Sequence, residues 1–172
     1  MKKQIITLLA IISVLASSCD KEEIPLGQDY FGVAQAIKNG EKWKPYIYAT
    51  SSRRDPEYIA IEMKVYNRYN IAREALFFTR VKKKEGSNAI KTFLYDASYF
   101  GYVSDGDVIC ASYQVGDSTE VAGHINVTKY NEENGALEGN FEVTLVKNYN
   151  CDESAPDTLH FTEGAFSTRV QD

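Results

Sequence analysis

The alternation of apolar and polar residues, interrupted by turn signals about every 8–12 residues, most constrains how this chain folds. In the stretch 58–66, apolar side chains occupy every second position, and Glu62 and Lys64 lie between them. A period of two places one set of side chains on each face of an extended chain. The stretch therefore predicts a half-buried antiparallel strand.

The same pattern recurs to the end of the chain. Turn residues such as Asn39-Gly40 separate the runs, and Asn-Gly is a strong hairpin signal. Twelve Tyr and eight Phe favour strands over helices. We predict about nine or ten strands, with 97–107 as the least regular stretch: 31–37, 42–49, 58–66, 75–81, 89–95, 108–115, 120–130, 136–147, 159–163 and 165–170.

This number of short strands predicts an all-β domain. We expect an antiparallel β-sandwich of about nine or ten strands, because the loops are uneven in length. An up-and-down β-barrel of lipocalin-like form is the alternative. The domain is expected to span residues 30–172, with neither an internal repeat nor a linker that would divide it.

The first 19 residues predict export. Two lysines precede an apolar run at 5–16, which is shorter than the roughly 20 residues of a spanning helix and is typical of a signal peptide. The run ends in LASSC, which resembles a bacterial lipobox, although Ala16 stands where leucine is usual. The resemblance implies removal of residues 1–18 and lipidation of Cys19. An ordinary secretory signal followed by a chance cysteine is the alternative.

Residues 19–29 are predicted to form a charged tether. Asp20-Lys21-Glu22-Glu23 directly follow the lipidated position and resemble the surface-export signal of Bacteroidetes lipoproteins. This resemblance implies a protein of the outer membrane, lipid-anchored and exposed at the cell surface. Retention on the periplasmic face is the alternative. Two or three acyl chains suffice for stable anchoring, since each buried methylene contributes about 0.8 kcal/mol.

Charge and cysteine content narrow the partners and the compartment. Loss of the two signal-peptide lysines takes the net charge from −5 to −7, which argues against nucleic-acid binding. With Cys19 assigned to lipid, Cys110 and Cys151 remain as an even pair in an oxidising compartment. We expect a disulfide between them, and one buried and one free thiol is the alternative.

Two segments carry a family resemblance. One is the hairpin 36–43 with its Trp43, and the other joins Gly139-Asn140-Phe141 to Thr162-Glu163-Gly164-Ala165-Phe166. Together they resemble small exported Bacteroidetes lipoproteins built from an uncharacterised all-β domain. The resemblance covers about a third of the chain. It implies an exported lipoprotein with a β fold, and no catalytic residue can be transferred from it.

No combination of residues predicts a catalytic or metal centre. His124 and His160 are the two histidines, and neither has the spacing of a zinc site. No G-x-S-x-G elbow accompanies them. The acidic clusters Asp105/Asp107 and Asp152/Glu153/Asp157 read as turns, although a calcium loop or a hydrolytic carboxylate pair is an alternative. We therefore expect no enzyme activity, no metal and no cofactor.

An aromatic-rich segment is the strongest candidate for ligand binding. It contains Tyr95, Tyr99, Phe100 and Tyr102, and aromatic rings can stack on sugar faces with little loss of entropy. Core packing is the alternative for all four. For Trp43 we favour the core, because it heads an early strand.

Three function classes follow. The leading hypothesis is a non-enzymatic, surface-tethered module that binds a glycan or an envelope protein. A structural or accessory subunit of an outer-membrane complex is the second, and an atypical carboxylate-pair hydrolase is the third. The lysine-rich stretch 82–88 is interpreted as a solvated hairpin tip, and a binding patch is the alternative. Asp117-Ser118-Thr119 and Asp157-Thr158-Leu159 resemble Bacteroidetes O-glycosylation sites, and a chance match is the alternative.

Overall fold

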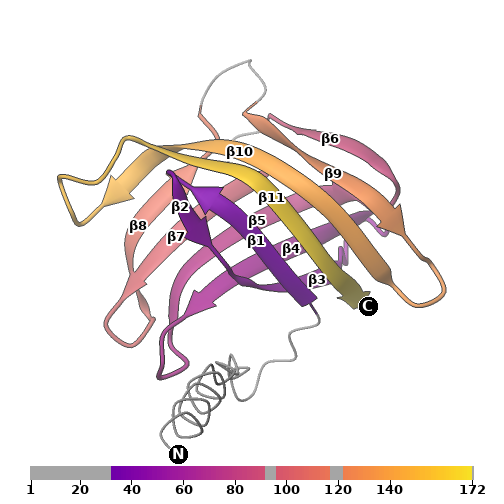
Figure 1. Ribbon diagram of the computed structural model, residues 1–172, viewed down its shortest axis with the longest axis horizontal. Helices are drawn as coiled ribbons and strands as arrows, with labels where there is room; N and C mark the ends of the chain where they lie inside the picture. Colours follow the sequence, from indigo (N-terminus) through magenta and orange to yellow (C-terminus); the bar gives the residue numbers. More distant parts are fainter. Residues whose placement is uncertain (1–31, 92–95, 117–121, 172) are drawn as a thin grey trace, which may run out of the picture.

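The computed structural model describes residues 32–91, 96–116 and 122–171 (Figure 1). Every regular element in these ranges is a strand, so the all-β prediction is confirmed. The eleven strands are β1 (Gly32–Lys38), β2 (Glu41–Trp43), β3 (Tyr46–Ser51), β4 (Tyr58–Tyr66), β5 (Ala72–Lys82), β6 (Gly86–Ile90), β7 (Ala97–Val103), β8 (Val108–Gln114), β9 (Gly123–Tyr130), β10 (Ala136–Asn150) and β11 (Thr158–Gln171).

All eleven strands belong to one sheet whose pairings close a ring. Antiparallel ladders join β1, β3, β4, β5, β7, β8, β10 and β11 in turn, and β11 pairs with β1. One short parallel contact, between β11 and β3, adds to the closure. The sheet therefore curls around a single core, in the sandwich-like or barrel-like manner expected for the fold class.

The long strand β10 shares one of its edges between two partners. Its first half pairs with β9, which carries β6 at its far edge, and its second half pairs with β8 (Figure 1). β5 and β6 follow one another but have no ladder between them. At this seam the backbone N–H of Lys82 donates instead to Asn88 Oδ1 at 2.9 Å. Residues 83–85 thus connect two strands that do not pair, and the stretch 82–88 is not a hairpin tip.

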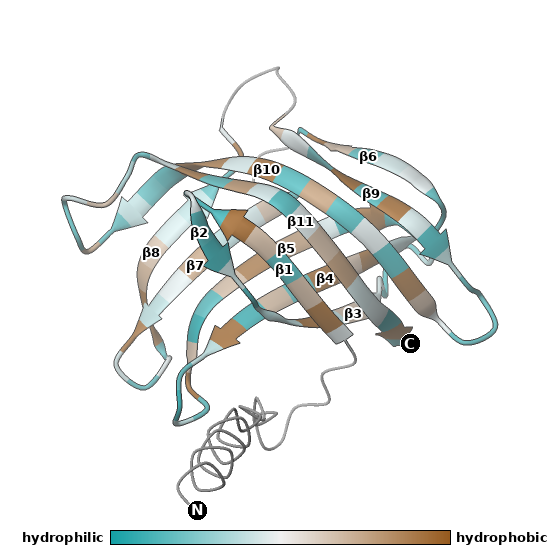
Figure 2. Ribbon diagram, in the orientation of Figure 1, coloured by the Kyte–Doolittle hydropathy of each residue, from teal (hydrophilic) through white to brown (hydrophobic). Residues whose placement is uncertain are grey.

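The inward-facing side chains fill the ring. Apolar and polar residues alternate along the strands (Figure 2), and Ile59, Ile61 and Met63 of β4 are all 0% exposed. Aromatic rings pack edge-on across the interior, as in the pair of Trp43 and Phe161 with centroids 5.0 Å apart. Burial of each large apolar side chain contributes about 1.5–3 kcal/mol, so this core is the main source of stability.

Two Gly-x-Phe sequences interlock where β10 meets β11. Gly139 pairs with Phe166, and Phe141 pairs with Gly164. A Cβ on Gly139 would lie 2.8 Å from Cε1 of Phe166, and one on Gly164 would lie 2.6 Å from the ring of Phe141. Each of these two phenyl rings therefore lies over the glycine of the opposite strand. This arrangement is possible only because glycine has no side chain. The motif that carries the family resemblance has a packing role.

Several strand boundaries differ from the sequence prediction. The run 42–49 is two strands, β2 and β3, separated by Lys44 and Pro45, because proline cannot donate to a ladder. The last two predicted strands are a single strand, β11, which passes through a bulge at Glu163 with φ of 52°. The stretch 97–107, predicted to be irregular, contains β7. Its alternation was hidden because both faces of β7 carry aromatic residues.

Cys110 and Cys151 form the expected disulfide. Their Cα atoms lie 5.1 Å apart, and the backbone N–H of Cys151 donates to the carbonyl of Cys110 at 2.7 Å. The bond joins β8 to the loop that follows β10, across 41 positions of sequence. In the chain-entropy account, a disulfide stabilises by restricting the unfolded chain.

Several predictions fall outside the described residues. They concern the signal peptide at 1–18, Cys19 with the tether to residue 29, Tyr95 and Asp117-Ser118-Thr119. Within the described ranges, none of the elements is a helix of the length and hydropathy needed to cross a membrane.

Candidate functional site

Six half-buried aromatic side chains project from the outer surface of four neighbouring strands. They lie opposite in phase to the core residues of the same strands, and none belongs to the core cluster. We call this surface the aromatic face, and it consists of Tyr46, Tyr48, Tyr66, Phe77, Phe100 and Tyr102. It is a candidate binding surface because the register of the strands brings these rings together on one side of the sheet.

Strand register aligns the aromatic face into rows that cross the strands. In the first row, Tyr46 pairs with Lys64, Lys64 pairs with Ala75, and Ala75 pairs with Phe100. Ala75 is 0% exposed, yet it is not part of the core cluster. The ring of Phe77, two positions along β5, lies 5.8 Å from that of Phe100. This edge-on pair thus lies beside Ala75 on the outer side of the sheet.

The second row places polar groups between the rings. Tyr48 pairs with Glu62, Glu62 pairs with Phe77, and Phe77 pairs with Ser98. Lys64 Nζ lies 2.7 Å from Glu62 Oε1, which forms an ion pair between the two rows. The two side chains are only 21% and 28% exposed. Aromatic surfaces flanking a charged donor and acceptor suit ligands that combine apolar ring faces with hydroxyl groups.

Two tyrosines at one end of the aromatic face remain protonated over a wide pH range. Partial burial, and then the nearby Tyr102, raise the pKa of Tyr66 to about 12. Burial, followed by the charge of Glu62, also raises the pKa of Tyr102. Both phenols are therefore hydrogen-bond donors at physiological pH.

Of the four aromatic residues that the sequence suggested as ligand-binding, the structure describes Tyr99, Phe100 and Tyr102, and it separates them. Phe100 and Tyr102 lie on the aromatic face, whereas Tyr99 points into the ring and is 6% exposed. Its inward position is the core packing that the sequence analysis gave as the alternative. Trp43 is also interior, at 4% exposed, as its place at the head of a strand indicated.

A polar cluster sits inside the ring around Glu74, a residue that the sequence analysis did not single out. Glu74 Oε2 accepts hydrogen bonds from Lys38 Nζ at 2.6 Å and from Trp43 Nε1 at 2.7 Å. Tyr99 lies beside it: burial, with the charge of Glu74 and a hydrogen bond to it, raises the pKa of the phenol far above its usual value. An acid in the inward phase of β5 was the signal that could have revealed this cluster.

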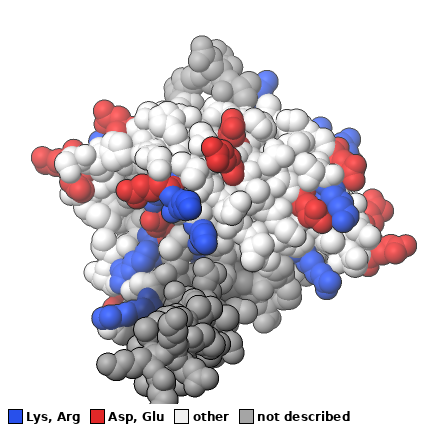
Figure 3. Space-filling model, viewed as in Figure 1, with Lys and Arg blue, Asp and Glu red and all other residues white. Residues whose placement is uncertain are grey.

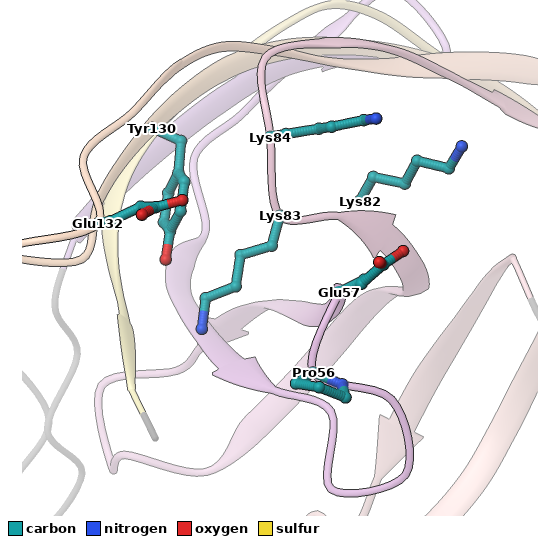
Figure 4. A pocket seen from close by; sticks show the side chains of 7 residues that line it. All are labelled: Pro56, Glu57, Lys82, Lys83, Lys84, Tyr130 and Glu132. Carbon is teal, nitrogen blue, oxygen red and sulfur yellow. The ribbon is translucent and has the colours of Figure 1, made fainter.

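Two hollows lie at the other end of β5. The larger, of about 520 Å³, includes Lys82, Lys83 and Lys84 in its lining, and the smaller, of about 280 Å³, includes Arg80 and Lys82. In Figure 4, Lys83 points toward the side that carries Tyr130, while Lys82 and Lys84 extend to the opposite side. Lys83 Nζ donates to Ser51 Oγ at 2.8 Å. Elsewhere, the face in Figure 3 has acidic and basic groups interspersed.

Neither histidine belongs to the aromatic face or lines either of the two hollows. His160 is exposed, and its ring nitrogens contact Thr144 Oγ1 at 3.0 Å and Thr158 Oγ1 at 3.1 Å. His124 is half-buried on β9, opposite Glu142. Among the described residues, no three His, Cys, Asp or Glu side chains come together in a way that could hold a metal ion.

The suggested carboxylate pairs occupy exposed loops. Hydrogen bonds from Ser154 lower the pKa of Asp152, and a hydrogen bond from Lys147 lowers the pKa of Asp157. A general acid requires the opposite shift. Asp105 and Asp107 lie in the exposed turn between β7 and β8.

Comparisons with known proteins add no relative. No protein-family model matches the chain, and neither a curated protein nor a solved structure matches it. The candidate function therefore depends on the chemistry of the surfaces described above.

Proposed function

We propose that this protein is a non-enzymatic, lipid-anchored surface protein that binds a glycan through the aromatic face. The observation that carries the proposal is the pair of cross-strand rows, in which rings flank the Lys64–Glu62 ion pair. Sugar rings present apolar C–H faces to aromatic rings and hydroxyls to charged groups. The proposal places the ligand on the outer surface because the rings that project there are not part of the core cluster.

A glycan array with the full-length protein in detergent micelles tests the proposal. We expect binding that the variant Phe100→Ala weakens, because the ring that borders Ala75 is lost. His160→Ala is the control, since it also removes a ring, and His160 is exposed on β11, outside the aromatic face. Equal binding by the wild type and Phe100→Ala, with both folded by circular dichroism, would contradict the proposal.

The anchor and the address are proposed on separate grounds. Cys19 at the end of the signal-like segment supports lipidation, and the acidic residues after it support surface display. In cells, Cys19→Ala should release the protein from the membrane fraction, and acyl chains should be visible as a mass increase on Cys19 of the wild type. Protease treatment of intact cells should remove the displayed protein, whereas survival beside a cut surface marker would place it on the periplasmic face.

An accessory-subunit role is the second candidate, and one observation favours it. Val103, Val108 and Ile109, at 38%, 47% and 46% exposed, form an apolar tip where β7 turns into β8. Exposed apolar patches of this kind are typical of protein contacts. Under this candidate, Val103→Ser with Val108→Ser, which changes a cross-strand pair, abolishes co-purification of a defined outer-membrane complex in gentle detergent, and glycan binding is unaffected.

A further inference from the structure

The outer surface of β4 and β5 changes character along the strands. Beyond the aromatic face, Tyr58 pairs with Lys82, and the guanidinium of Arg80 lies 5.6 Å from the centroid of the Tyr58 ring. Lys84 follows two positions after Lys82 and lines the larger hollow with it. We call this continuation of the same surface the basic end: Tyr58, Arg80, Lys82 and Lys84.

Positive charge is concentrated at the basic end, although the chain as a whole has a negative net charge. The two hollows together are lined by five basic and three acidic side chains, although the protein has a net charge of −5. Within the described residues, no carboxylate oxygen lies within 4.0 Å of the ammonium of Lys82 or Lys84. These two cations are therefore available to a ligand, which need not displace an internal partner.

The basic end and the aromatic face lie within reach of one extended ligand. Tyr66 and Tyr58 stand at opposite ends of β4 on the same phase. At about 3.3 Å per residue, the strand places them roughly 26 Å apart. A linear chain of several sugar rings lying along β4 and β5 contacts rings at one end and cations at the other.

We propose, resting on the function proposed above, that the ligand is an acidic polysaccharide whose carboxylate or sulfate groups bind the basic end. The aromatic face supplies stacking on the sugar rings, and Lys82 and Lys84 supply charge recognition. Because both ammonium groups are exposed, salt should screen their share of the binding and leave the stacking share in place.

The test compares acidic polysaccharides with uncharged counterparts of the same backbone. The probes are polygalacturonate, alginate and chondroitin sulfate, each beside a form whose carboxyl groups are reduced and, for chondroitin sulfate, whose sulfate groups are also removed, with the full-length protein in neutral detergent at low salt. We expect at least one acidic probe to bind about three- to tenfold more tightly than its counterpart, the range of a few exposed ion pairs. Lys82→Gln with Lys84→Gln should abolish this preference and leave binding of the counterpart unchanged.

A charge-matched control separates a site from bulk charge. Lys42→Gln with Lys129→Gln removes the same two charges from exposed positions elsewhere and should retain the preference. An equal loss in this control, or no preference in the wild type, overturns the inference. Tighter binding to vesicles of anionic lipid than to any polysaccharide also overturns it, in favour of a membrane surface.

The two proposals fail in different ways. If Phe100→Ala weakens binding to the uncharged counterparts while acidic probes bind no better, the glycan function stands and the acidic preference is wrong. If none of the six probes and no glycan on the array binds, both proposals fail.

Discussion

On β7, Tyr99 points into the ring, while its neighbours Phe100 and Tyr102 point out of it. The inner side meets Phe161 and the Glu74 cluster, and the outer side meets Phe77 and the Lys64–Glu62 pair. Both sides are rich in aromatic residues, so composition alone cannot separate core from binding surface. The phase within the strand separates them, because successive side chains point to opposite faces.

The largest difference between the two sides should be in stability. Phe161 is 1% exposed, and Phe161→Ala should lower the free energy of unfolding by about 3–5 kcal/mol. Phe100→Ala on the outer side should cost about 1 kcal/mol, because that ring is only half-buried and leaves no closed cavity. Urea unfolding of both variants measures this, and equal losses would break the distinction.

Removal of the disulfide tests whether glycan affinity is independent of the stability of the fold. Cys110→Ser with Cys151→Ser should lower the free energy of unfolding by about 3–4 kcal/mol, since the bond closes a loop of roughly 40 residues. At temperatures where this variant stays folded, glycan affinity should be unchanged. An affinity loss as large as that of Phe100→Ala would mean that binding at the aromatic face depends on the stability of the whole fold.

The inner cluster depends on one acid. Glu74→Gln keeps the size of the side chain but removes the negative charge that Lys38 and Trp43 contact. Because Lys38 and Glu74 are 20% and 25% exposed, we expect a loss of about 1–3 kcal/mol in thermal or urea unfolding. Glu62→Gln, the matched change on the outer side, should cost less than Glu74→Gln and affect glycan binding more.

The smallest expected effect is a loss of folding stability at alkaline pH. The folded-state pKa values of Tyr66, Tyr99 and Tyr102 lie above the ordinary value of about 10, so the folded protein holds these protons longer than the unfolded chain. Their contribution is complete below pH 10 and is lost as pH rises through the folded pKa, about 12 for Tyr66. Between pH 9 and 12 the unfolding free energy should fall, and Tyr99→Phe should flatten that fall more than Tyr66→Phe. A steeper fall in Tyr99→Phe would contradict the assignment.

Sequence pattern predicted well wherever one face of a strand is polar. The boundaries predicted for the strand at 58–66 are those of β4. Prediction failed at β7, where both faces carry rings, and at Pro45, which divides one predicted strand into two. The disulfide followed from cysteine counting. Of the aromatic face, Phe100 and Tyr102 were predicted, but their four partners on β3, β4 and β5 could not be, because only strand register brings them together.

The interlocked Gly-x-Phe pairs also restrict the register in which β10 and β11 can pair to close the ring. In the native alignment, Phe141 and Phe166 each face a glycine of the opposite strand. A slip of two residues in one direction would set Phe141 opposite Phe166, and a slip in the other would set Gly139 opposite Gly164. The first alignment crowds two rings and the second leaves a gap, although both preserve which side chains face the core. The motif thus favours a single register between the two longest strands.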